Sequence, residues 1–195
     1  MIFRELYDRA AALPAPPVGF NYLCDLIVAY HDELGRIDTY AVTHPEPNKQ
    51  AYYRLGENDR SSSYDEEFQV AEIVYCDGLD ADERERRFAL TKELMHVFDQ
   101  PDAMVDTPEK FRALLREIQN KPLDQSPMFK SELDTRWMAA IILCPKPFRD
   151  NVLADYQAKR LENFDIAEFF DIPEWVAPFV MDDYYNVAFA RFVGP

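Results

Sequence analysis

The feature that most constrains this chain is a helix predicted over residues 86–99, which carries three chemically active side chains close together. Lys92 and His96 are four residues apart, so they lie on one face of a helix, with Glu93 beside them. The apolar side chains recur with the 3.6-residue helical period and predict a face turned to the core: Leu90, Leu94, Val97 and Phe98.

This spacing is that of the H-E-x-x-H helix, in which two histidines one turn apart bind zinc and the glutamate activates a water. In this chain Lys92 stands at the position of the first histidine. A zinc hydrolase needs three protein ligands, an open position for water and a base. His96 can supply one ligand and Glu93 the base. Glu132, near the start of a helix predicted over 131–144, is the candidate for a further ligand.

A lysine at a ligand position weakens the case for zinc, because a protonated ammonium has no lone pair. To bind a metal, Lys92 would need its pKa of about 10.4 lowered below neutrality, and neighbouring carboxylates oppose that change. His31, His44 or Asp99 could replace the lost ligand, although no spacing requires it. The alternative interpretation is purely structural. In it Lys92 is a solvated helix residue, His96 a hydrogen-bonded core histidine and Glu132 a carboxylate at the start of a helix.

Charge and cysteine content narrow the class of protein. The 195 residues carry a formal net charge of −15, which argues against binding a nucleic-acid backbone. Three widely spaced cysteines predict free thiols in a reducing compartment and no disulfides. The longest apolar run, residues 137–144, is far shorter than the roughly 20 residues of a membrane span. We therefore expect a cytoplasmic protein that does not enter the membrane.

The order of predicted elements is helices, strands and again helices, which indicates an α+β domain with a small antiparallel or mixed sheet. Strands are predicted over 37–43, 50–55 and 68–76, and a polar loop over 56–67. Besides the central helix, helices are predicted over 3–12, 20–34, from 107 onward, 131–144, 148–161, 166–170 and 173–181. Residues 184–193 are predicted to form an aromatic strand or a terminal extension. We expect one domain over 1–195, with residues 1–17 forming an N-terminal helix and a proline-rich connector.

Two segments together resemble a known family. Residues 87–96, RFALTKELMH, resemble the R-F-x-x-x-H-E-x-x-H helix of the ImmA/IrrE family of metallopeptidases. Residues 132–145, ELDTRWMAAIILCP, are similar to its E-x-x-A-N-x-F-A-A-x-L-L-M-P segment. The preceding strand and residues 166–173 also resemble family segments, so the resemblance covers residues 68–181.

The resemblance implies a zincin-like fold, with a small sheet packed on the active-site helix and a helical C-terminal half. It implies that His96 is a zinc ligand, Glu93 the catalytic glutamate and Glu132 the glutamate that completes the metal shell. Lys92 departs from the family at the other zinc histidine, which leaves no zinc or only weakly bound zinc as the expectation. Family members are endopeptidases that act on a regulator, often a repressor of a phage, a mobile element or a stress response.

Three functions remain open from the sequence. The first is a catalytically impaired metallopeptidase homologue that binds a protein partner, such as a repressor or another regulator. The second is an active metallo-endopeptidase with a rearranged metal shell, and the third is a structural or immunity-type binding protein that reuses the fold. In the first case we expect the ammonium of Lys92 to replace the metal as a fixed cation paired with Glu132, Glu93 or both.

Overall fold

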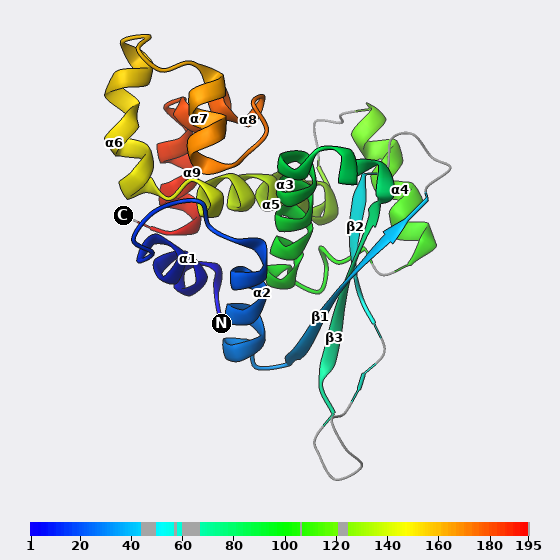
Figure 1. Ribbon diagram of the computed structural model, residues 1–195. Helices are drawn as coiled ribbons and strands as arrows, with labels where there is room; N and C mark the ends of the chain where they lie inside the picture. The colour runs from blue at the N-terminus through cyan, green and yellow to red at the C-terminus, as the bar shows by residue number, and fades with distance from the viewer. Residues whose placement is uncertain (44–49, 57, 60–66, 106, 121–124, 195) are drawn as a thin grey trace.

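The computed structural model describes residues 1–43, 50–56, 58–59, 67–105, 107–120 and 125–194. It has a mixed α+β fold, in which a small sheet lies on one side of two central helices and a group of short helices lies on the other (Figure 1). The predicted α+β class is confirmed at this level. His44 and most of the predicted loop over 56–67 lie outside the described residues.

The sheet has three strands in the order β1-β3-β2, built from β1 (Leu34–Val42), β2 (Ala51–Leu55) and β3 (Gln69–Cys76). Strand β1 runs parallel to β3 and β2 runs antiparallel to it, so the sheet is mixed. The near-continuous apolar run of β3 belongs to the central strand, whose buried residues are Val70, Ala71, Ile73 and Val74.

The junction between β1 and β3 contains a register shift at Gly35, between Leu34 and Arg36. A Cβ at Gly35 would collide with the ring of Phe68. Glycine therefore lets the backbone of β1 approach the start of β3 at this irregularity.

The central helix of the sequence becomes α3 (Glu83–Leu94), followed by the tighter 3-10 turn η2 (Met95–Phe98). Its N-cap is Asp82, whose carboxylate accepts from the backbone N–H groups of Arg84 and Glu85. From the sequence alone we expected Asp80 to cap this helix, with Asp82 in its first turn, and this expectation is wrong. Asp80 lies in the 3-10 helix η1 (Asp77–Ala81) and pairs with Arg86 at 2.7 Å.

Helix α5 (Pro127–Leu143) packs against α3 and forms the second central element. Its N-cap is Ser126, which accepts from the N–H of Phe129, so the helix begins four residues before the predicted start at 131. Residues from Ala139 to Cys144 are all fully buried at its C-terminal end. This segment anchors α5 in the core and fixes where its first turns meet α3.

The N-terminal helices are α1 (Phe3–Ala11) and α2 (Phe20–Tyr30), joined by the predicted proline-rich connector. The predicted extension of the second helix to residue 34 is wrong, because Leu34 belongs to β1. Helix α4 (Pro108–Asn120) lies beside α5. The remaining helices are α6 (Lys146–Gln157), α7 (Asn163–Phe170), α8 (Val176–Met181) and α9 (Tyr184–Phe192).

Arg87 links α3 to the segment before α2 and to the end of the helix over residues 163–170. Its guanidinium donates to the carbonyl oxygens of Val18, Phe170 and Asp171. A planar fork of donors suits this task, because it satisfies several backbone carbonyls that would otherwise be buried without partners. These bonds hold α3 in place as the platform for the site.

Two further findings bear on the class of protein. Cys24, Cys76 and Cys144 are all free thiols. No helix in the described parts of the chain has the length and apolar character needed to cross a membrane.

Candidate functional site

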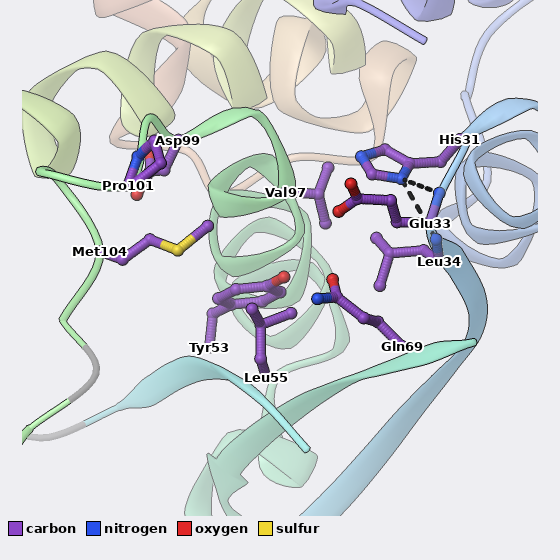
Figure 2. A pocket seen from close by; sticks show the side chains of 10 residues that line it. All are labelled: His31, Glu33, Leu34, Tyr53, Leu55, Gln69, Val97, Asp99, Pro101 and Met104. Atoms are coloured by element: carbon purple, nitrogen blue, oxygen red, sulfur yellow. Dashed lines mark hydrogen bonds between the residues drawn. The ribbon is translucent and has the colours of Figure 1, made fainter. Parts of the chain in front are cut away.

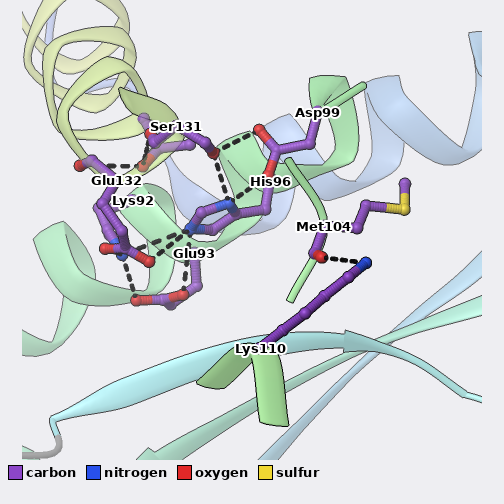
Figure 3. A network of polar contacts seen from close by, with 9 residues as sticks. Lys92, Glu93, His96, Asp99, Met104, Lys110, Ser131 and Glu132 are labelled. Atoms are coloured by element: carbon purple, nitrogen blue, oxygen red, sulfur yellow. Dashed lines mark hydrogen bonds and ion pairs between the residues drawn. The ribbon is translucent and has the colours of Figure 1, made fainter. Parts of the chain in front are cut away.

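The structure brings Lys92, Glu93, His96 and Glu132 together between α3 and α5 (Figure 3). The ammonium nitrogen of Lys92 lies 2.5 Å from Oε2 of Glu132 and 3.0 Å from Oε1 of Glu93. It also lies 3.4 Å from Nε2 of His96. The side chain of Lys92 is only 14% exposed, so these contacts are shielded from solvent. Lysine thus occupies the point on which the three other side chains converge.

The ring of His96 is fixed in orientation by groups on its far side. Its Nδ1 lies 2.7 Å from Oδ2 of Asp99, one turn further along the chain. The hydroxyl of Ser131 donates to the other oxygen of Asp99 at 2.6 Å, which ties this carboxylate to α5. Tyr53 of β2 stacks on the imidazole, with ring centroids 6.1 Å apart. Because Asp99 receives Nδ1–H, the Nε2 edge of His96 is directed at the Lys92 ammonium and the glutamates.

The electrostatics of the cluster favour its charged form. Burial alone would lower the pKa of His96, but hydrogen bonds to Asp99 and Glu132 outweigh it and raise that pKa to about 9. Burial would raise the pKa of Glu132, yet the hydrogen bond from His96 and the charge of Lys92 lower it to about 2. Burial also opposes the charge on Lys92, and the carboxylates of Glu93 and Glu132 more than compensate, so its pKa is raised.

The cluster therefore contains two cations, Lys92 and protonated His96, facing the carboxylates of Glu93, Glu132 and Asp99. Two positive charges are also what a zinc ion would bring to the same cleft. The side chains of this chain thus supply internally the positive charge that clustered carboxylates require when they are removed from water.

The residues in their observed arrangement do not fit a zinc ion. Zinc binds nitrogen and oxygen ligands at about 2.0–2.2 Å, and the atoms that could serve converge on an ammonium nitrogen that has no lone pair. Within the described residues, no group of three or more histidine, cysteine, aspartate or glutamate side chains is placed to hold a metal ion. His31, one of the suggested substitute ligands, instead accepts at Nδ1 from the backbone N–H groups of Glu33 and Leu34.

The sequence identified the four side chains at the centre of the cluster but missed most of their supports. Asp99 was considered only as a substitute ligand, although its position three residues after His96 was a signal for a local contact. Ser131 and Tyr53 were not assigned any role. Their contacts with the cluster come from α5 and β2, and no spacing within α3 indicates them.

Comparison with known proteins finds no family model that matches this chain and no curated protein with a significant sequence match.

Proposed function

We propose that this chain is a zincin-like protein related to the ImmA/IrrE family, in which Lys92 takes the place of the metal. It does not hydrolyse peptides, and it acts by binding a protein partner, such as a repressor or another regulator of a phage, mobile element or stress response. The observation that carries this proposal is the convergence of Glu93, His96 and Glu132 on the ammonium of Lys92.

The position of Glu93 also supports the loss of catalysis. A glutamate that activates water must be free to accept a proton from it. In this cleft the Glu93 carboxylate is 8% exposed and pairs with Lys92 at 3.0 Å. The carboxylate is thus already engaged by an ammonium and shielded from solvent, so it is poorly placed to accept a proton from a water.

The ordered surroundings of the cluster support a binding role. Asp99 and Ser131 orient His96. The cleft is filled by satisfied ion pairs, and the surface carries exposed large side chains, among them Trp175 at 51% and Tyr184 at 72%. Aromatic side chains of this kind are common at protein interfaces.

Metal content tests this proposal. After dialysis against metal-free buffer and addition of one equivalent of zinc, the parent protein should retain far less than one zinc per chain. Lys92→His restores a second imidazole one turn before His96, so its zinc affinity should rise more than about tenfold, since losing even an outer-shell partner of a metal site costs about 10–100-fold. Lys146→His, at a partly exposed lysine in α6 outside the cluster, is the matched control and should leave zinc affinity unchanged.

Two results would overturn the proposal. Stoichiometric zinc in the parent, together with peptide cleavage that Glu93→Gln abolishes, would identify an active metallo-endopeptidase with a rearranged metal shell. A Lys92→His protein that folds but binds zinc no better than the parent would show that this cleft does not have the geometry of a zincin site.

A further inference from the structure

A second feature lies next to the cluster, on the other side of Tyr53 and Asp99. It is a cavity of about 210 Å³ between the end of α2, the starts of β1 and β3, strand β2 and the turn after η2 (Figure 2). Its apolar walls are formed by Leu34, Leu55, Val97 and Met104. The sequence analysis did not predict it, because its walls come from five segments that are distant in the chain.

Three polar groups point into this cavity: the carboxylate of Glu33, the hydroxyl of Tyr53 and the amide of Gln69 (Figure 2). None of the three side chains has a hydrogen-bond partner among the described residues. His31 fixes the turn that carries Glu33, because its Nδ1 accepts from two backbone N–H groups, each at 3.3 Å. The polar groups are therefore carried by β2, β3 and the turn that His31 stabilises, and they remain available to a ligand.

The electrostatic character of the cavity is acidic. Glu33 supplies one carboxylate at the rim, and Asp99 supplies a second in the wall. Both oxygens of Asp99 already accept hydrogen bonds, from His96 and Ser131, and protonated His96 offsets its charge, so Glu33 is the main acidic group of the cavity. Burial and the charge of Asp99 raise the pKa of Tyr53, so its hydroxyl stays protonated. Among the described residues that line the cavity none is a lysine or an arginine, and the nearby ammonium of Lys110 is bonded to the carbonyl oxygen of Met104 at 3.1 Å.

We propose that this cavity binds an arginine or lysine side chain of the protein partner; the inference rests on the proposed partner-binding function. The apolar walls suit the methylene stem of such a side chain. The cationic head then pairs with Glu33, donates to the amide oxygen of Gln69 and lies against the ring of Tyr53.

Other side-chain classes fit this cavity less well. An acidic side chain would face the carboxylate of Glu33 in a chain whose net charge is −15. A purely apolar side chain would bury the Tyr53 hydroxyl and the Gln69 amide without hydrogen bonds, which costs free energy. A basic side chain satisfies both the charge and the polar groups.

Titration with capped amino acids, followed by NMR of the full chain, tests this inference. N-acetyl-arginine methylamide or its lysine counterpart should shift the signals of Glu33, Tyr53 and Gln69. The neutral isostere N-acetyl-citrulline methylamide should leave them unchanged at the same concentration. Glu33→Gln should weaken binding by about tenfold, since a hydrogen bond to a charged group is lost.

Asp32→Asn is the matched control, because it removes the same charge one residue away, from a side chain that is 93% exposed. It should change the affinity less than about twofold, because exposed charges interact weakly. Equal weakening by Asp32→Asn and Glu33→Gln, equal binding of the citrulline probe, or no shift at these residues with either basic probe would each overturn the inference. The readout does not depend on zinc or peptidase activity, so it fails or succeeds separately from the proposed function.

Discussion

At the scale of single residues, Lys92 shows what sequence spacing can and cannot predict. The helical period places Lys92, Glu93 and His96 on neighbouring faces, and this much follows from local geometry. The contact with Glu132 was predicted from its place at the start of a helix together with the family resemblance, because the spacing within α3 does not indicate how α5 packs on it. The support of His96 by Tyr53 depends on tertiary packing in the same way and had no sequence signal.

Removal of the lysine should be costly. Lys92→Ala leaves Glu93 and Glu132 as neighbouring carboxylates without the ammonium between them, and we expect a loss of about 3–5 kcal/mol in the free energy of unfolding. Chemical denaturation monitored by circular dichroism measures this loss. Addition of Glu132→Gln to the alanine variant should restore part of the stability, since it removes one of the unpaired charges.

Lys146→Ala is the surface comparison for this experiment. Lys146 pairs with Asp150 at 2.8 Å, but its side chain is 34% exposed, so we expect a loss below about 1 kcal/mol. If Lys92→Ala cost as little as Lys146→Ala, the cluster would not be a buried ion network.

At the scale of elements, the sequence predicted most helices and strands but misassigned segments whose state depends on neighbours. Residues 184–193 are rich in aromatic and β-branched side chains, which favour strands by propensity. They form helix α9 instead, because Tyr185 and Ala188, three residues apart, are both buried on the face that packs against α5 and α8. Tertiary burial overrides the local preference here.

Helix α4 shows a different shortfall. Its apolar period predicted a face made of Phe111, Leu114, Leu115 and Ile118, of which the side chain of Phe111 lies outside what the structure describes. Leu114 is buried, whereas Leu115 is 39% and Ile118 42% exposed. The period indicates which side chains can be buried together, but burial also needs a second element to cover them.

The two adjacent leucines of α4 provide a matched pair of variants. Leu114→Ala should lower the free energy of unfolding by about 2–5 kcal/mol, because it leaves a cavity against α5. Leu115→Ala should cost less than about 1 kcal/mol, since alanine is a good helix former and the residue is 39% exposed. Urea denaturation of both variants measures the difference, and equal losses would contradict this packing of α4.

At the scale of the whole molecule, the sequence correctly indicated an α+β chain with a large negative net charge. The structure shows which of the charged side chains are buried. Thirty-six acidic and 21 basic side chains give the net charge of −15. Most of these charges lie at the surface, where solvent screens them. The guanidinium groups of Arg87 and Arg149 are buried, and the side chains of the cluster between α3 and α5 are also shielded, so that their protonation is linked to folding.

The pH dependence of stability should reveal this linkage. The pKa of His96 is raised from 6.5 to about 9, so its contribution is complete below pH 6.5 and is lost as the pH rises through 9. The pKa of Glu132 is lowered from 4.5 to about 2, so its contribution is complete above pH 4.5 and is lost as the pH falls through 2. The cluster should therefore contribute most between about pH 4.5 and 6.5.

The difference in the free energy of unfolding between the parent and a single variant separates the contribution of one cluster residue from that of the rest of the molecule. The stability difference between the parent and His96→Gln should shrink as the pH rises from 6.5 to 9. The difference for Glu132→Gln should shrink as the pH falls below 4.5. Denaturation of all three proteins across this range measures both trends. A stability difference for His96→Gln that does not shrink between pH 6.5 and 9 would mean that His96 is neutral in the folded protein, and that Lys92 alone provides the positive charge of the cleft.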